Sequence, residues 1–458
     1  MSYYSKNDTT LSEAFIDAVT SSVDSLVLYA PLDNALIVVF HAGVGQDFAV
    51  PFLDPTPYDL SSAYVDSDML SGWDPLSELG FNVDHGIILP ETQNHIFYDV
   101  IEDLFWAETD YCDYQIGLTG IFSLLMGYAL GLPPLYNTDT GDAGVGVFGL
   151  MDYGSNNGRG VVPAPPTAWT KIHMGWDDPI AISKDNNLDS LEFSINNSQI
   201  YKINLSENEY FLIENRNNWI QDNADMDSLR IKNKIDDTRL GHWFDTFINE
   251  TTSDQVIIDL ETNVITELDN YNYGLPGSGL LIWHITESNL FNFNGINNDP
   301  NNRVVHLEEA DGAVDIGFPT TAMFADPTKG WRWDMWYNDN PAYNQLNPYI
   351  ENIIFNNISY PNTRTNSGAE SFVSIFNISD SDYNMNYKVL LNDGFKYTLL
   401  NLESINIIGN GNENNIGHIY YTYNNHLYDS RIEDGLLVID SVFINDDFNQ
   451  IVLSNNYC

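Results

Sequence analysis

The sequence predicts an α+β protein, because one part of the chain has the apolar periodicity of helices and a longer part has the alternation of strands. Apolar side chains recur at helical spacing in residues 93–108, and residues 114–131 form a second, more apolar run of this kind. From about residue 185 the chain changes to short alternating runs, such as residues 209–216 and 279–285, separated by Asn, Asp, Gly and Ser. We therefore expect an α+β unit followed by an all-β, sandwich-like region.

The elements of the α+β unit can be justified in chain order. Two β-rich runs separated by a turn come first, and the second, residues 35–40, is continuously apolar, as in a strand covered on both faces. The helix predicted over residues 114–131 ends at Gly131, a suitable C-terminal cap, and Pro133 and Pro134 prevent its continuation. Helices covering a short sheet are the expected arrangement.

Three parts are expected along the chain. Residues 1–182 form the α+β unit, residues 183–391 the β-rich, sandwich-like region, and residues 392–458 the start of a β-repeat such as a propeller blade. The chain begins without the apolar core of a secretory signal peptide, and it ends on a strand-like segment. We therefore expect a fragment of a longer protein, truncated at both ends.

The charge balance excludes some partners. The chain has 65 acidic and 17 basic residues, which gives a formal net charge of -48. Such a surface repels nucleic acid and anionic lipid, and it suits a medium rich in salt or calcium. The longest apolar run, residues 121–136, is broken by Gly and Pro, so no membrane-spanning segment is expected. Two cysteines, Cys112 and Cys458, do not settle the redox compartment.

One segment carries a family resemblance. Residues 127–155 resemble the active-site region of the immune inhibitor A-type secreted metalloproteases, in which Gly-Leu-Pro-Asp-Leu-Tyr follows a His-Glu-x-x-His helix and a Met-turn comes next. The matching residues here are Gly131, Leu132, Pro133, Leu135, Tyr136 and residues 149–152, with Met151 at the Met-turn. Further segments match in order between about residues 35 and 385: 40–48, 163–176, 209–216, 275–285 and 306–317. The resemblance implies a zincin-like fold for residues 1–182 and a secreted or cell-surface protein.

The metal positions depart from the family pattern. Carried over by position, the two His ligands become Leu124 and Tyr128, the general base becomes Leu125, and the later Asp ligand becomes Pro134. Leu and Pro offer no lone pair, and a phenol with a reference pKa near ~10 is a poor ligand. A catalytic zinc needs about three protein ligands. No zinc is therefore expected. His41 is expected to be a packed or hydrogen-bonded side chain rather than a ligand.

Calcium is the more credible ion, because clustered carboxylates in loops suit Ca²⁺. Two loops carry such carboxylates: Asp139 and Asp142 in one, and Asp222, Asp225 and Asp227 in the other. The alternative, that each loop is a solvated acidic turn, stays open. Residues 139–141 match the Asp-Thr-Gly of aspartic proteases, but this motif occurs once and lacks a partner carboxylate, so it is interpreted as a turn.

The aromatic segment of residues 331–337 has two interpretations, a ligand-binding surface or ordinary core, and its tryptophans are Trp331, Trp333 and Trp336. The sequence predicts a catalytically inactive homologue of this protease family, which binds a peptide, a polysaccharide or a cell-surface partner. Two alternatives stay open. One is an active metallopeptidase or other hydrolase with atypical ligands, and the other is a structural surface-layer or adhesin module.

Overall fold

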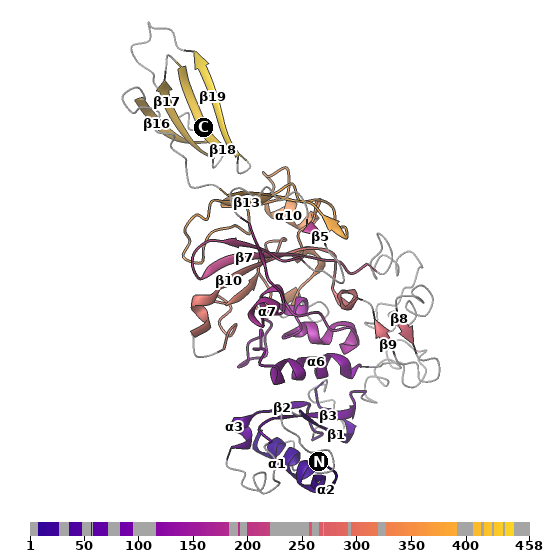
Figure 1. Ribbon diagram of the computed structural model, residues 1–458. Helices are drawn as coiled ribbons and strands as arrows, with labels where there is room; N and C mark the ends of the chain where they lie inside the picture. The colour runs from indigo at the N-terminus through magenta and orange to yellow at the C-terminus, as the bar shows by residue number, and fades with distance from the viewer. Residues whose placement is uncertain are drawn as a thin grey trace.

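The computed structural model describes the parts of the chain that position the candidate sites. The described residues are 8–26, 36–47, 56, 58–71, 83–94, 116–182, 191–192, 199–219, 256–258, 265–268, 270–291, 295–318, 327–391, 406–413, 416–423, 426–433 and 436–443. Helices and sheets are both present, which confirms the α+β class. The elements follow one another from the N-terminal sheet at the bottom of Figure 1 to the C-terminal sheet at the top. Most of the predicted helix over residues 93–108 and both cysteines lie outside the described residues.

The N-terminal elements form a small sheet with a helix on each face. The strands are ordered β1-β3-β2, with β1 parallel and β2 antiparallel to β3. On β3, Ile88 joins a core with Phe15 of the first helix, whereas Ile87 and Leu89 join a core with Leu125. This two-residue alternation places α1 and α6 on opposite faces. The bounds are α1 Asp8–Ser21, α2 Val23–Leu26, β1 Ile37–Val44, β2 Ala63–Val65, α3 Ser67–Leu70, β3 Gly86–Thr92 and α6 Leu118–Ala129.

The prediction that residues 35–40 form a strand covered on both faces is confirmed for residues 36–39, since Ile37 and Val39 pack against the core with Phe15 whereas Leu36 and Val38 pack against the core with Leu125. These residues enter β1, which is an edge strand in the described part of the sheet, and Phe40 on it is largely exposed. The strand that is buried over most of its length is β3, which lies between β1 and β2. The continuous apolar run therefore predicted the two covered faces of the strand, whereas its place at the edge depends on which strand acquires two neighbours.

The helix predicted over residues 114–131 is confirmed as α6. It ends before Gly131, whose φ of +84° is the left-handed conformation expected of a glycine cap. The Leu132 N–H donates to the Gly127 carbonyl at 2.9 Å and closes the last turn. The chain then continues through η3 Gly146–Phe148, η4 Tyr153–Gly160 and α7 Ala168–His173.

A five-stranded sheet in the order β11-β10-β7-β6-β4 forms the centre of the molecule. Alternate residues of β7 and β10 enter two different cores. Leu212 and Trp283 face a core shared with α7 and Met151, whereas Phe211 and Ile282 face a core on the other side. Residues from both sides of position 182 therefore share one core. The bounds are β4 Ile180–Ala181, β6 Tyr201–Asn204, β7 Glu209–Arg216, β10 Gly279–Thr286 and β11 Val305–Leu307.

A second sheet, in the order β12-β13-β15, closes the other core. Phe355, Ile375 and Val389 from its three strands pack with residues of β7 and β10, so the two sheets enclose this core as in a sandwich. The short helix α10 adds Tyr343 to the same core. The bounds are η7 Pro327–Lys329, η8 Arg332–Asp334, α10 Pro341–Leu346, β12 Ile354–Phe355, β13 Val373–Phe376 and β15 Lys388–Leu391.

The remaining elements lie outside these layers. A four-stranded antiparallel sheet, ordered β16-β17-β18-β19, follows them, and whether it begins a propeller-like repeat stays a prediction. No described helix combines the length and apolar character needed to span a membrane. The bounds are β5 Leu191–Glu192, β8 Val256–Ile258, β9 Ile265–Leu268, η5 Tyr271–Gly274, η6 Glu287–Phe291, β14 Asn384–Met385, β16 Asn406–Glu413, β17 Ile416–Tyr423, β18 His426–Glu433 and β19 Leu436–Phe443.

Candidate functional site

The helix that was expected to carry the protease motif has an apolar interior face. Leu125, at the general-base position, is only 4% exposed and packs with Ile87 and Leu89 of β3. Leu124, at the first ligand position, packs against the core that holds Met151 instead. The two leucines therefore join α6 to different parts of the protein. Neither side chain offers a donor atom to a metal.

Tyr128, at the second ligand position, is committed to a neighbouring phenol. Its hydroxyl lies 2.9 Å from the hydroxyl of Tyr136, and its ring lies 6.1 Å from that of Tyr64, measured between centroids. Burial raises the pKa of Tyr128 above its ordinary value, and the contact with Tyr136 raises it further. The phenol is therefore neutral at physiological pH. Pro134 is half-buried and has no donor atom, so the residues around α6 do not fit zinc.

The predicted Met-turn packs directly on α6. Met151 is buried, and a Cβ placed on Gly127 would lie 2.5 Å from the Met151 sulfur. The next residue, Asp152, is buried and accepts N–H bonds from residues 144, 145 and 146 through Oδ2, at 2.7, 2.7 and 2.8 Å. Burial raises its pKa to about 6 against the opposing effect of these bonds. Asp152 therefore anchors the loop, and Gly127 leaves room for Met151 on the helix.

The other residues expected near this site do not complete a metal centre. His41 lies on the edge strand β1, with Nδ1 3.2 Å from the carbonyl oxygen of Ala42. Within the described part of the chain, the one set of three or more His, Cys, Asp and Glu side chains placed to share an ion lies elsewhere. His41 is hydrogen-bonded, as expected.

The loop that carries Asp139 and Asp142 is a self-bonded turn. Asn137 Oδ1 accepts N–H bonds from Asp139 at 2.9 Å and Thr140 at 3.2 Å, and the Thr140 hydroxyl donates to Asp142 Oδ2 at 2.6 Å. The interpretation of the Asp-Thr-Gly motif as a turn is confirmed. No third carboxylate of the described residues joins Asp139 and Asp142, and calcium there stays a prediction. The second acidic loop, with Asp222, Asp225 and Asp227, lies outside the described residues.

The structure brings together a different set of carboxylates, which we call the acidic centre: Glu309, Asp311 and Asp334. One oxygen from each lies within 4.8 Å of the others. Glu309 and Asp334 are both 1% exposed, and Asp311 is half-buried and gives the centre its open side. The Ala310 N–H donates to the Asp334 carbonyl at 2.9 Å, so a backbone bond holds the two segments together.

The local sequence shapes each half of the acidic centre. Glu309 accepts N–H bonds from Asp315 at 2.8 Å and Ile316 at 3.3 Å, which folds the chain back after Gly312. Gly312 has a φ of +68°, a conformation that favours glycine. On the other side, Asp334 Oδ2 accepts the N–H of Trp331 at 2.6 Å. These bonds orient the carboxylates but leave other oxygen lone pairs for a ligand.

The electrostatics of the acidic centre favour a cation or a proton. Burial raises the pKa of Glu309 to about 8, and repulsion from Asp315 and Asp311 adds to the rise. Burial also raises the pKa of Asp334 well above its ordinary value, with further repulsion from Glu309 and Asp311. A donor set made only of carboxylate oxygens suits the hard cations Ca²⁺ and Mg²⁺ rather than zinc.

Buried carboxylates on or next to the five-stranded sheet are paired with basic side chains of the chain itself. Glu214 pairs with Arg216 at 2.9 Å and faces Lys171 at 3.7 Å. His284 lies between two carboxylates, with Nδ1 2.9 Å from Glu308 and Nε2 2.9 Å from Glu209. Although burial opposes its charge, these hydrogen bonds raise the pKa of His284 to about 9. Glu214, Glu209 and Glu308 are therefore balanced by basic side chains of the chain itself.

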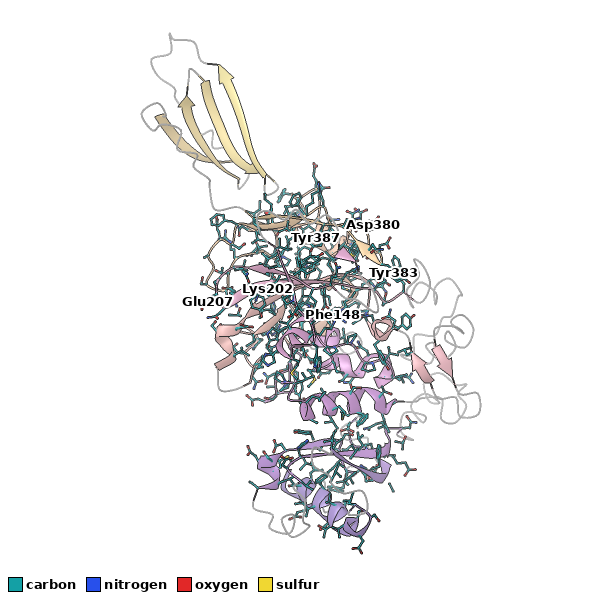
Figure 2. All side chains as sticks on the ribbon, viewed as in Figure 1. Phe148, Lys202, Glu207, Asp380, Tyr383 and Tyr387 are labelled. Carbon is teal, nitrogen blue, oxygen red and sulfur yellow. The ribbon has the colours of Figure 1, made fainter. Side chains whose placement is uncertain are left out.

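Arg303 is the basic residue beside the acidic centre, and one of its N–H groups donates to a backbone carbonyl instead of a carboxylate. Burial lowers the pKa of Arg303, and the nearby charge of Glu309 partly offsets this effect. The Arg303 Nη2–H donates to the Ile316 carbonyl at 2.5 Å. Phe148, labelled in the central body in Figure 2, supports the segment that leads into Asp334, because a Cβ on Gly330 would lie 2.6 Å from its ring. The acidic centre is thus built on the same core as the Met151 loop.

The tryptophans of residues 331–337 divide between the two interpretations. Trp336 is fully buried, and its Nε1–H donates to the Glu308 carbonyl at 2.8 Å. Trp331 and Trp333 stack with their ring centroids 5.9 Å apart and their planes 13° apart, and Trp333 is exposed. Core packing thus accounts for Trp336, and the stacked pair borders the acidic centre through Asp334.

Sequence reasoning missed the acidic centre for an identifiable reason. Glu309 and Asp311 lie in residues 306–317, which were noted only for their family resemblance, and Asp334 was read as part of an aromatic segment. The Glu-Ala-Asp-Gly stretch was the local signal for a carboxylate turn. Nothing in the spacing could bring Asp334 to it, because their proximity depends on tertiary contacts.

Comparisons with family models, with curated proteins and with solved structures gave no match to this chain. The resemblance to the immune inhibitor A-type metalloproteases therefore stays a prediction drawn from its motifs.

Proposed function

We propose that this chain is a catalytically inactive homologue of the immune inhibitor A-type metalloproteases, secreted or at the cell surface, which acts by binding a partner. The observation that carries the proposal is Leu125. Its side chain fills the position of the general base and packs against Ile87 and Leu89. Without ligands to hold a metal, a water at this helix would stay a poor nucleophile.

Tyr128 supports the same proposal. An active centre of this kind needs an open position for water next to the metal. Here the Tyr128 hydroxyl is bonded to that of Tyr136 at 2.9 Å, and burial keeps the phenol protonated. The leucines and the tyrosine pair stabilise the packing of α6 where active relatives would carry out hydrolysis.

The second part of the proposal concerns calcium. We infer that the acidic centre holds one calcium ion, bound by Glu309, Asp311 and Asp334. The role of this ion is structural, because it stabilises the fold and takes part in no catalysis. The support is the burial of two carboxylates whose pKa values are raised by that burial and by repulsion from neighbouring carboxylates, Asp311 among them. A divalent cation offsets both effects at once.

Proteolysis is the experiment that tests the first part. The purified chain is incubated with casein in the presence of added zinc, next to an active zinc endopeptidase as the positive control. We expect no cleavage above the buffer blank. Cleavage that a chelator abolishes and that Tyr128→Phe removes would establish the alternative, an active metallopeptidase with atypical ligands.

The remaining alternatives need separate readouts. Cleavage that resists chelators but is blocked by a serine-directed inhibitor would indicate a hydrolase with a different site. Binding to cell-wall material with no discrete peptide or glycan ligand would favour the structural surface-layer or adhesin module. The proposed function expects saturable binding to a soluble peptide or glycan.

A further inference from the structure

An exposed apolar patch lies next to the acidic centre. Its members, which we call the apolar patch, are Leu346, Tyr349, Ile358 and Tyr360, with exposed fractions of 48%, 93%, 56% and 49%. Exposed apolar side chains gathered on neighbouring turns mark an interaction site more often than isolated ones do. The patch combines two aromatic and two aliphatic side chains, which can bury substantial area against a partner.

The backbone beneath the apolar patch is held by buried asparagines. Asn347 Nδ2 donates to the Tyr360 carbonyl at 2.7 Å, and Asn347 Oδ1 accepts the Tyr360 N–H at 2.8 Å. Asn356 Oδ1 accepts the N–H groups of Ile358 and Ser359, both at 2.9 Å. These bonds join the two turns that carry the patch. The patch is therefore pre-organised, which lowers the entropic cost of binding.

The apolar patch and the acidic loop meet at Gly312. A Cβ on Gly312 would lie 2.8 Å from Cδ1 of Tyr360 and 3.0 Å from Cδ1 of Leu346. Asp311 precedes this glycine, and the exposed Glu351 follows the turn that holds Tyr349. Apolar surface and negative charge are thus placed side by side, on a chain whose net charge is -48.

We propose that the apolar patch docks a basic amphipathic segment of a partner protein. The apolar side chains of that segment would cover Leu346 and Tyr360, and its Lys or Arg residues would face Glu351 and the net negative charge that three carboxylates and one calcium ion leave at the acidic centre. Charge complementarity selects this occupant, since an acidic peptide or an anionic membrane would be repelled. The inference rests on the proposed function and names the chemical class of its partner.

A labelled peptide tests the docking surface. The probe is a fluorescein-labelled amphipathic helix of Lys, Arg, Leu and Phe, and its matched control has Glu at every basic position. Binding is measured by fluorescence anisotropy at about 0.15 M salt, where long-range attraction is screened. We expect saturable binding of the basic peptide alone.

Variants locate the binding. Tyr349→Ser combined with Ile358→Ser removes two largely exposed side chains and should leave the fold intact. This double variant is expected to weaken binding about tenfold or more, as for the loss of central interface side chains. The control is Tyr58→Ser, a side chain that is 62% exposed in a different part of the chain. It should leave the affinity unchanged within about twofold, since single exposed side chains away from an interface contribute little.

Three results would overturn the inference. Equal binding by the double variant and the Tyr58→Ser control would mean diffuse attraction to the acidic surface. Absence of binding would remove the proposed occupant. Binding of a soluble glucan that the double variant loses would assign the patch to a polysaccharide. Mass spectrometry of the recovered peptide keeps the two proposals separate, because cleavage would contradict the proposed function whatever the affinities show.

Discussion

The interior face of α6 and the acidic centre are two solutions to the same physical problem, the filling of a buried position. At α6, hydrocarbon from Leu125 packs against β3, and the Tyr128 hydroxyl is bonded to that of Tyr136. At the acidic centre, Glu309 and Asp334 are buried to a similar degree, but burial raises the pKa of both carboxyls and repulsion from neighbouring carboxylates raises them further. Burial of a leucine is favourable by about 2 kcal/mol, whereas burial of an uncompensated charge is strongly unfavourable.

The comparison teaches where ion chemistry is expected in this protein. A sequence motif points to α6, yet Leu124 and Leu125 on this helix have no donor atom that could bind a metal. No motif points to the acidic centre, yet its carboxylates need a cation or a proton to be stable. The predictions that follow change one of the two regions at a time.

The largest loss of stability is expected when a carboxyl is introduced into the apolar interior at α6, which makes it resemble the acidic centre. Leu125→Glu places a carboxyl in the apolar core beneath β3, and we expect a loss of about 4 kcal/mol in the free energy of unfolding at pH 7. The loss should shrink at pH 4, because the buried carboxyl then carries a proton. Urea unfolding measures it. Phe122→Glu, at a more exposed position on the same helix, should cost less than about 1 kcal/mol, and equal losses in the two variants would contradict the apolar interior.

His284 shows how the protein balances carboxylates without an added ion. Its pKa is raised to about 9 in the folded state, so its contribution is fully present below about pH 6.5 and is lost as the pH rises through 9. His284→Gln should therefore lose about 3 kcal/mol at pH 6 and much less at pH 10.

A second histidine on the neighbouring strand is the control for His284. Burial lowers the pKa of His306 to about 4, so this imidazole is neutral across that range. The cost of His306→Gln, measured by urea unfolding, should be slightly smaller at pH 6 than at pH 10, because the unfolded imidazole binds a proton at pH 6 that the folded one does not. A pH-independent cost for His284→Gln would contradict the charged imidazole between Glu209 and Glu308.

The acidic centre should respond to pH with the same sign as His284, but over a lower pH range. In chelator, the raised pKa of Glu309 means that the folded state binds its proton more tightly than the unfolded state. Stability should therefore be highest below the unfolded pKa and should fall as the pH rises from about 4.5 to about 8. Glu309→Gln should remove this fall and stabilise the chelated protein by about 2 kcal/mol at pH 8.

Calcium should reverse the effect of that substitution. With excess calcium, the wild-type protein should gain more stability than Glu309→Gln, because a ligand that binds only the folded state stabilises it. Thermal unfolding at pH 8 measures the gain. The exposed Glu351→Gln is the matched control and should behave as wild type. Equal calcium effects in all three proteins would place the ion elsewhere.

The smallest effect is expected for Tyr128→Phe. It removes one hydrogen bond to the half-buried Tyr136 and keeps the ring that packs near Tyr64. We expect a loss of about 1 kcal/mol in urea unfolding. Tyr58→Phe, at an exposed position, should change nothing measurable. A loss several times larger would mean that the Tyr128 hydroxyl has a further buried partner.

Local features of the sequence predicted local structure well. The helix over residues 114–131 was predictable because Gly131 ends it and its apolar side chains recur on one face. The two covered faces of the strand over residues 36–39 were predictable from its continuous apolar run, but its edge position was not, because β3 rather than β1 became the central strand. Asp334 could not be assigned to the acidic centre from sequence, since a backbone bond to Ala310 brings it there. The absence of metal-binding side chains at Leu124 and Leu125 was readable directly from the sequence.

The most direct test of the account is the metal content of the folded chain. The protein is dialysed against equal concentrations of calcium and zinc and analysed by inductively coupled plasma mass spectrometry, beside Asp334→Asn and Tyr128→Phe. We predict no stoichiometric zinc, and a calcium content that Asp334→Asn lowers by about one ion per chain. Stoichiometric zinc that Tyr128→Phe removes, with calcium unchanged in Asp334→Asn, would contradict it.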